Sequence, residues 1–114
     1  MKPEERDAAH LWDMLQSARD AKALLRGRTL AEYLGDRMRR LALERALELV
    51  GEAARRVSAV RQRAHPEIEW RAIIGLRNLL AHEYGAIDQE RLYLTGRQSV
   101  PQLIEALEAI LEEA

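Results

Sequence analysis

With 114 residues and no cysteine, the chain can bury a modest core, but it cannot form disulfides, a zinc–thiolate site or a thiol nucleophile. Its 18 basic and 19 acidic residues give a formal net charge of −1, so overall charge selects no partner. No apolar run approaches the ~20 residues that a membrane span requires, and the charged N-terminus lacks the apolar core of a secretory signal. We therefore expect a single cytoplasmic domain over residues 1–114 that does not associate with a membrane.

The charges are unevenly distributed along the chain. Residues 37–63 contain eight arginines and three glutamates, whereas residues 83–114 contain seven acids and two arginines. This pattern would suit an anionic partner on one surface and a basic partner on another. On charge alone, solvated helix faces with i,i+4 ion pairs are the simpler interpretation, so charge leaves the choice open.

Ala, Leu, Glu and Arg dominate and no alternating β-branched run occurs, which predicts an all-α fold. A first helix is expected over residues 3–26, with Pro3 in its first turn and Gly27 as its stop. Its apolar stripe includes Trp12, and we expect both Trp12 and Trp70 to be core anchors rather than platforms for base stacking.

The next two helix starts have recognisable caps. Thr29 and Glu32 have the spacing of a capping box, which predicts a short helical turn. Asp36 can then cap a long second helix that continues to about Ala64. Apolar residues lie on more than one side of this helix, so it requires two neighbouring helices or a partner subunit. These residues are Met38, Leu41, Ala42, Leu43, Ala46, Leu47, Leu49, Val50, Ala53, Val57 and Val60.

Gly51 lies inside the long helix, where glycine costs roughly 1 kcal/mol relative to alanine, so we expect a close helix crossing there. Residues 65–66, His-Pro, end that helix, and the next helix begins within residues 67–70 and stops at Gly85.

A final helix is expected from the Asp88 cap to about Glu113. It should be interrupted between Gly96 and Pro101, because a proline inside a helix removes a hydrogen bond and kinks the chain.

Residues 73–85, with the sequence IIGLRNLLAHEYG, hold the densest set of reactive side chains. At about 100° per residue, Arg77 and His82 point roughly 140° apart on one helix. They could therefore meet if the arginine curls round, or across the two-fold axis of a homodimer whose facing helices form a narrow cleft.

These residue types suit RNA cleavage without a metal. His82 falls near the helix C-terminus, where the helix dipole favours the imidazolium, and it can move protons. Arg77 can stabilise charge on a phosphoryl oxygen, Asn78 can position either group, and Tyr84 can hydrogen-bond or stack. Spacing alone favours a structural interpretation, in which Tyr84 covers a core edge and Arg77 pairs with an acid.

That acid could be Glu83 or Glu52. We expect Glu52 to be a buried acid that reaches Arg77, because small residues surround it in sequence. Three scattered histidines without close acidic partners predict no metal site, and no residue pattern calls for a cofactor.

Residues 75–84, GLRNLLAHEY, resemble the signature of the HEPN superfamily, and more narrowly the HepT toxins of HEPN/MNT toxin–antitoxin pairs. Matching stretches follow in the family's order at residues 50–54, 65–70, 86–88 and 100–103. The motif itself shows no departure, although a tryptophan is more usual where Leu92-Tyr93 stands.

The resemblance implies a homodimeric helical bundle of four to five helices, with a long second helix and a kinked last helix. It implies a ribonuclease toxin of a type II-like pair that cleaves RNA without metal in a cleft at the dimer interface. Arg77 and His82 would be catalytic, assisted by Asn78, with Glu52 and Glu83 as supporting residues. A minimal nucleotidyltransferase (MNT) antitoxin would neutralise the toxin by transferring AMP from ATP to Tyr84.

Two other classes of function stay open. The chain could be a non-catalytic HEPN module that binds a nucleotide or partner and serves as substrate of the nucleotidyltransferase. It could also be a plain α-helical interaction domain in which the motif only shapes a dimer interface.

Overall fold

The computed structural model describes residues 3–83, 85 and 87–113, and every regular element among them is helical. The expected all-α bundle is therefore confirmed, with four longer helical runs and two short helices, α2 and α4. The elements are α1 (Pro3–Leu25), α2 (Leu30–Leu34), α3 (Arg37–Ala54), α4 (Ala59–Ala64), α5 (Trp70–His82), α6 (Gln89–Leu94), the π-helical segment η1 (Thr95–Ser99) and α7 (Val100–Glu113).

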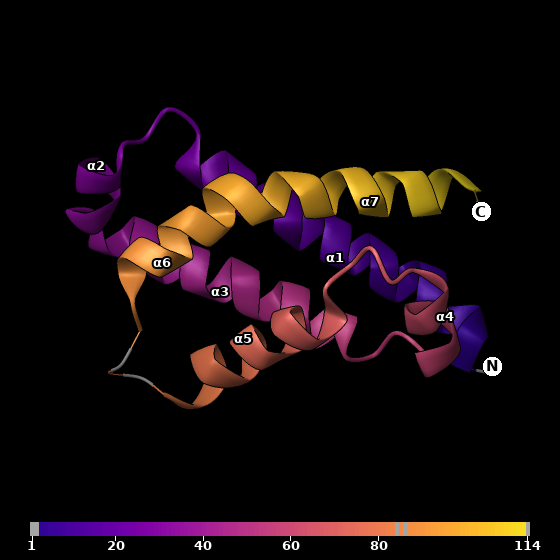
Figure 1. Cartoon of the computed structure of the whole chain (residues 1–114). Helices are drawn as coiled ribbons and strands as arrows, with labels where there is room; N and C mark the ends of the chain where they lie inside the picture. Colours follow the sequence, from indigo (N-terminus) through magenta and orange to yellow (C-terminus); the bar gives the residue numbers. More distant parts are fainter. Residues whose placement is uncertain (1–2, 84, 86, 114) are drawn as a thin grey trace.

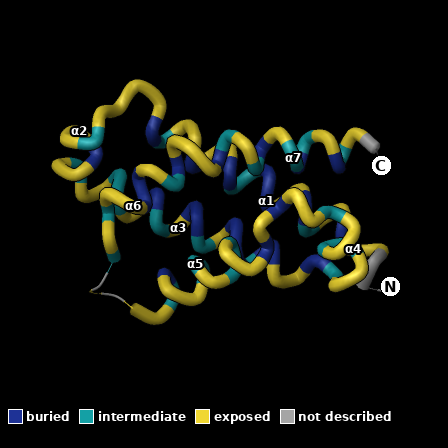
Figure 2. Tube along the Cα trace, in the orientation of Figure 1, coloured by how far each residue is buried: buried dark blue, intermediate teal, exposed yellow. Residues whose placement is uncertain are grey.

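Helix α3 lies at the centre of the bundle. It packs against α1 on one side and α5 on the other, and α1 also packs against α7 (Figure 1). Buried residues line the surfaces where these helices meet, while the outer faces are exposed (Figure 2). Large side chains that are fully buried include Leu11, Met14, Leu15, Leu25, Tyr33, Leu43 and Leu107. Among the described residues, no helix is both long and apolar enough to cross a bilayer.

The caps predicted near the start of the chain are confirmed. Gly27 adopts a φ of 70°, a left-handed conformation that ends α1 at little steric cost. Thr29 and Glu32 form the capping box of α2, each side chain accepting the other residue's backbone N–H. Asp36 caps α3 by accepting the backbone N–H of Arg39.

The prediction that the second helix continues to about Ala64 is wrong, because α3 ends at Ala54 and a separate helix α4 begins after Ser58. Ser58 caps α4 by accepting from the Arg61 backbone N–H. The carboxylate of Asp7, 2% exposed, accepts from Ser58 N at 2.8 Å and from Ser58 Oγ at 2.6 Å. This contact from α1 offers the backbone an alternative to continued helix.

The two tryptophans differ in burial. Trp70 is 8% exposed and donates its indole N–H to the His65 carbonyl at 3.0 Å, so its predicted role in the core is confirmed. Trp12 is 51% exposed, so the same prediction for Trp12 is wrong. The buried face of α1 runs through Leu11, Met14, Ala18, Ala21 and Leu25, and Trp12 lies one residue off this line.

The last helical run is interrupted where Pro101 predicts it, but the chain stays helical there. The N–H of Val100 bonds to the carbonyl of Thr95, a π-type bond that shifts the register just before the proline, which has no N–H. The ribbon changes direction between α6 and α7 (Figure 1). Gly96 is buried against Leu25, whose Cδ1 lies 2.4 Å from the place a Cβ would occupy.

Candidate functional site

Arg77 lies where α5 crosses α3 most closely. A Cβ on Gly51 would sit 2.2 Å from Arg77 Cβ and 2.9 Å from the Ile73 carbonyl oxygen, so only glycine fits at this position. The expectation that Gly51 serves a close helix crossing is confirmed. The crossing places the Arg77 stem against α3, and the side chain is 20% exposed.

Glu52, the next residue on α3, pairs with Arg77, as expected from the sequence. Arg77 Nε lies 2.9 Å from Glu52 Oε2, and Arg77 Nη1 donates to Asn78 Oδ1 at 3.0 Å. The Nε–H does not point at the carboxylate, so this buried nitrogen has no hydrogen-bond partner among the described residues. The guanidinium is therefore held by charge on one side and by an amide on the other.

Two further arginines share the same carboxylate. Arg55 Nε lies 3.2 Å from Glu52 Oε2, and Arg56 Nη2 lies 3.0 Å from Glu52 Oε1. We call Arg55, Arg56 and Arg77, gathered around Glu52, the arginine cluster. Sequence reasoning found the pair of Glu52 with Arg77 but missed the other two members, although the i,i+3 and i,i+4 spacing from Glu52 was a usable signal.

The arginine cluster also sets the protonation of Glu52. Burial alone would raise the pKa of this carboxyl, but the hydrogen bond from Arg56 and the charges of Arg55 and Arg77 together lower it below its usual 4.5. Glu52 is therefore a carboxylate at neutral pH, able to hold a cation.

His82 lies elsewhere on α5. It is the last residue of the helix and is exposed, with Asn78 on the same side one turn earlier. No hydrogen bond or ion pair joins His82 to Arg77 within the described part of the chain. The exposed side of α5 also carries Gly75, where an added Cβ would meet no atom within 4 Å. Arg77 and His82 thus occupy opposite sides of one helix, as the spacing predicts.

Glu83 follows the last residue of α5. The N–H of Glu83 caps α5 by donating to the Leu79 carbonyl at 3.0 Å, and the Glu83 side chain is exposed. Arg77 pairs with Glu52 rather than with Glu83. Tyr84, the expected site of modification, lies outside the described residues.

A hydrogen-bonded chain that sequence reasoning missed fixes the segment after the motif. Tyr33 Oη donates to Gln89 Oε1 at 2.6 Å, and Gln89 Nε2 donates to Glu44 Oε2 at 2.8 Å. Burial, reinforced by the Glu44 charge, raises the pKa of Tyr33 to about 12, so its hydroxyl stays protonated and donates. With Asp88 capping α6, these contacts anchor the chain just beyond the motif.

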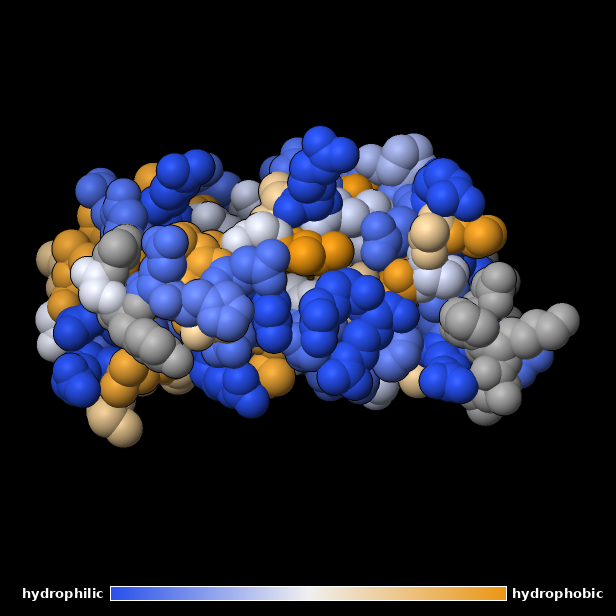
Figure 3. All heavy atoms as spheres, turned by 90° about the horizontal axis from the view of Figure 1, so that it is seen from below, coloured by the Kyte–Doolittle hydropathy of each residue, from blue (hydrophilic) through white to orange (hydrophobic). Residues whose placement is uncertain are grey.

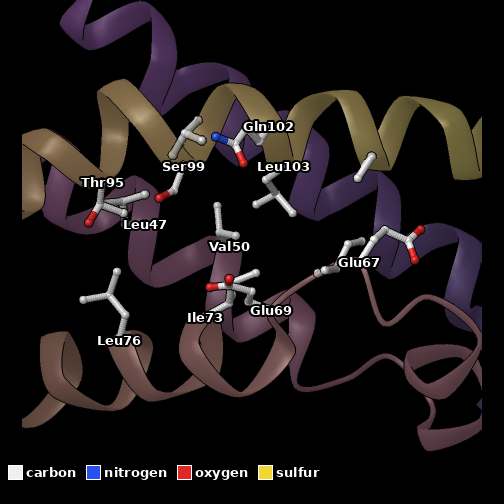
Figure 4. Close-up of a pocket in the computed structure, with 13 residues that line it drawn as sticks. Leu47, Val50, Glu67, Glu69, Ile73, Leu76, Thr95, Ser99, Gln102 and Leu103 are labelled. Atoms are coloured by element: carbon white, nitrogen blue, oxygen red, sulfur yellow. The ribbon is translucent and has the colours of Figure 1, made fainter.

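A hollow of about 160 Å³ lies between α3, α5 and α7, but Arg77, Asn78 and His82 are not among the residues that line it. Leu47, Val50, Ile73 and Leu103 line its interior, and its rim includes Thr95, Ser99 and the carboxylates of Glu67 and Glu69 (Figure 4). Because acids and no bases line the rim, the hollow is unsuited to a phosphodiester. The candidate site built from Arg77, Asn78 and His82 therefore lies outside this hollow.

Seen from the side on which α5 and α4 lie, hydrophilic side chains cover the middle of the molecule, with small hydrophobic patches between them (Figure 3). This face is thus suited to a charged ligand rather than to an apolar one. Among the described residues, no three His, Asp or Glu side chains lie close enough together to hold a metal ion.

Comparison with known proteins identifies the family of the chain. The family model described as "Ribonuclease HepT-like" matches residues 14–110. "Putative RNase MJ1380" of Methanocaldococcus jannaschii is 33% identical over 102 residues, covering 90% of this chain and 94% of that protein. "Probable ribonuclease HepT" of Thermococcus cleftensis is 36% identical over 72 residues, covering 63% and 66% respectively. No solved structure matches the chain.

Proposed function

Because the chain belongs to the ribonuclease HepT-like family, we propose that it is a metal-independent endoribonuclease whose active site is built from Arg77, His82 and Asn78. The observation that carries this proposal is the support of Arg77. Its guanidinium is oriented by Glu52 at 2.9 Å and by Asn78 at 3.0 Å before any ligand arrives. A preorganised cation of this kind stabilises charge that develops on a phosphoryl oxygen.

In the proposed reaction, an RNA 2′-hydroxyl attacks the adjacent phosphorus and the 5′-oxygen of the next nucleotide leaves. The 2′-O–P bond forms as the P–O5′ bond breaks, giving a 2′,3′-cyclic phosphate and a free 5′-hydroxyl. His82 removes the 2′-hydroxyl proton or protonates the leaving oxygen, and Arg77 binds the non-bridging oxygens.

The opposite placement of Arg77 and His82 favours a site shared between two copies of the chain. If two α5 helices face each other across a two-fold axis, the His82 of one copy can approach the Arg77 of the other. The exposed side of α5 suits this arrangement, because among the described residues no atom from outside the helix lies within 4 Å of a Cβ placed on Gly75, and Leu79 is 36% exposed. An interior glycine without a neighbour in its own chain is explained by close approach of a second helix.

A cleavage assay in EDTA tests the ribonuclease proposal. The wild type should cut a long single-stranded RNA into fragments that end in a cyclic phosphate. Arg77→Ala and His82→Ala should each lose at least about a hundredfold in rate. Equal cleavage by all three proteins would indicate a contaminant and refute the proposed site.

We further propose that the protein is a cytoplasmic toxin of a type II-like pair and that an MNT-type nucleotidyltransferase is its antitoxin. The Tyr84 hydroxyl would attack the α-phosphorus of ATP, forming the Oη–P bond, losing its proton and releasing pyrophosphate. The AMP adduct would add negative charge to the site in which Arg77 is proposed to bind the RNA phosphate. Supporting residues in this scheme are Glu52, which holds Arg77, and Glu83, which ends α5 just before Tyr84.

Growth of a bacterial host after induction tests the toxin proposal. Wild-type protein should arrest growth, His82→Ala should not, and a co-expressed MNT protein should relieve arrest while adding one AMP to the wild type but not to Tyr84→Phe. Modification of Tyr84 without RNA cleavage would instead identify a non-catalytic module that the nucleotidyltransferase modifies.

A further inference from the structure

The arginine cluster holds more positive charge than its single acid neutralises. Three guanidinium groups contact the two oxygens of Glu52, which leaves a formal excess of two positive charges at the end of α3. Arg55 and Arg77 both contact Oε2, so their guanidinium groups lie close enough to bind neighbouring anionic groups. An uncompensated cluster of this kind attracts a polyanion.

The three arginines differ in exposure. The Arg77 side chain is 20% exposed, whereas those of Arg55 and Arg56 are 49% and 58% exposed. Arg77 is thus held inside the crossing of α3 and α5, while the other two extend to the surface beside it. A strand whose scissile phosphate lay on Arg77 would pass over these two side chains.

A gain in folding stability does not explain why Arg55 and Arg56 lie beside Glu52. An exposed ion pair contributes about 0–1 kcal/mol, and a third cation on one carboxylate is repelled by the other two. Arg55 donates its hydrogen bond to Glu52 from Nε, and its two terminal nitrogens donate no hydrogen bond to the described residues. Those nitrogens form the planar fork that binds two oxygens of a phosphate.

We propose that Arg55 and Arg56 form a second phosphate-binding position beside Arg77, which takes the phosphodiester adjacent to the one that is cleaved. This inference rests on the proposed ribonuclease function and deepens it. Glu52 has two roles in this arrangement, because it orients Arg77 and also holds the Arg55 and Arg56 side chains beside it. Arg55 and Arg56 are substrate-binding residues and take no part in proton transfer.

Binding to a non-cleaving protein tests the proposal. In a His82→Ala background, the affinity for a single-stranded RNA oligonucleotide is measured at several KCl concentrations. Arg55→Gln with Arg56→Gln should weaken binding about tenfold or more near 0.15 M salt and flatten the salt slope by roughly 0.7, since the two arginines share one phosphate and each phosphate contact on a single strand contributes about 0.7. Arg55→Lys with Arg56→Lys should restore most of the slope, because it keeps both charges.

Arg19→Gln with Arg45→Gln is the matched control, because both side chains are exposed and each pairs with one glutamate, Glu108 or Glu48. This control should bind within about twofold of the parent, with an unchanged slope. Equal losses in the two glutamine pairs, or no RNA binding by the parent at low salt, would overturn the proposal.

Cleavage by the otherwise wild-type protein separates this proposal from the ribonuclease function. Arg55→Gln with Arg56→Gln should raise KM while leaving kcat within about threefold. Cleavage with an unchanged KM would refute the second phosphate position alone. RNA binding that depends on Arg55 and Arg56, without cleavage by any variant, would refute the ribonuclease and leave this position intact.

Discussion

At the scale of single residues, Glu52 joins the packing of the bundle to the chemistry of the site. It is part of α3, yet it contacts Arg77 of α5 and the two arginines that follow the end of α3. Glu48, one turn earlier, has the same 25% side-chain exposure, but among the described residues it pairs with Arg45 alone, at 3.4 Å. The two glutamates therefore form a matched pair for mutation.

We predict that Glu52→Gln lowers the free energy of unfolding by about 1–2 kcal/mol, because Arg77 then lacks its ion-pair partner. It should also slow RNA cleavage about tenfold or more, since Arg77 is no longer held in place. Urea denaturation and the cleavage assay measure the two effects. Glu48→Gln should change stability by less than about 1 kcal/mol and leave cleavage unchanged, and a similar loss in both variants would contradict this role.

The effect of Glu52→Gln on the free energy of unfolding should depend on pH in one direction. The folded-state pKa of Glu52 lies below 4.5, so its stabilising contribution is complete above pH 4.5 and is lost as pH falls through the folded value. The difference in unfolding free energy between wild type and Glu52→Gln should be constant from pH 7 to about 5 and shrink at lower pH. A difference that grew on acidification would be inconsistent with the lowered pKa.

Two glycines on facing helices give opposite predictions. Gly51→Ala should destabilise the protein by about 1–3 kcal/mol, despite the better helix propensity of alanine, because the new Cβ collides with Arg77 and the Ile73 backbone. Gly75→Ala should raise stability by up to about 1 kcal/mol in dilute protein, since the added Cβ meets no described atom from outside its own helix within 4 Å. Thermal unfolding measures both, and a gain from Gly51→Ala would contradict the close crossing.

Residue-level features could be predicted where the signal was local. The capping box of Thr29 with Glu32 depends on a three-residue spacing, and Gly51 signals a crossing because an interior glycine requires a reason. The exposure of Trp12 could not be predicted in this way, because a shift of one residue around α1 decides between core and solvent. The rotation of α1 about its own axis is fixed by its packing against α3 and α7.

At the scale of elements, a contact between distant residues determines the end of α3. Asp7 of α1 accepts two hydrogen bonds from Ser58, which lies 51 residues away in the sequence. Residues 55–64 are rich in arginine and alanine, and their helix propensity predicts an unbroken helix. The end of the helix at Ala54 was therefore not predicted, since no local sequence pattern shows that a buried carboxylate from another helix binds Ser58.

We predict that Asp7→Ala costs about 1–3 kcal/mol, because it leaves the Ser58 N–H without its acceptor. Hydrogen exchange should accelerate most in residues 55–64, whose connection to α1 depends on this contact. Asp13→Ala, on the exposed side of the same helix, is the control and should leave both measurements nearly unchanged. Uniform acceleration across the chain would argue against a local anchor.

At the scale of the whole molecule, the outer faces of α3 and α5 carry more apolar surface than one copy of the chain covers. Met38 is 74% exposed, Leu41 43%, Leu49 37% and Leu79 36%. The sequence indicated that the second helix needs two neighbours or a partner subunit, and α1 and α5 supply two neighbours, one on each side. A second copy is the partner that the proposed function requires.

A charge placed on this face should disrupt that dimer. We predict that Leu79→Lys shifts sedimentation equilibrium from dimer to monomer, because it buries an unpaired charge in the proposed interface. Leu34→Lys, at a 42% exposed leucine of α2, is the control and should stay dimeric. A wild type that sediments as a monomer at micromolar concentration would contradict the shared site.

The fold class and most helix boundaries could be predicted from composition, caps and breakers, and the structure confirms them apart from the break between α3 and α4. The composite site could be predicted only in part. The helix period places Arg77 and His82 on opposite sides of α5, but a single sequence does not show what faces the exposed side. The second copy therefore stays a proposal that mixing experiments can decide.

The most direct test of the shared ribonuclease site is cleavage by a one-to-one mixture of Arg77→Ala and His82→Ala after subunit exchange. Each variant alone should be inactive. Half of the dimers in the mixture should be mixed, and each would hold one intact pair of Arg77 and His82, so the mixture should recover about a quarter of wild-type activity. A mixture as inactive as its two components, beside an active wild type, would place both residues of each site in one chain and contradict this account.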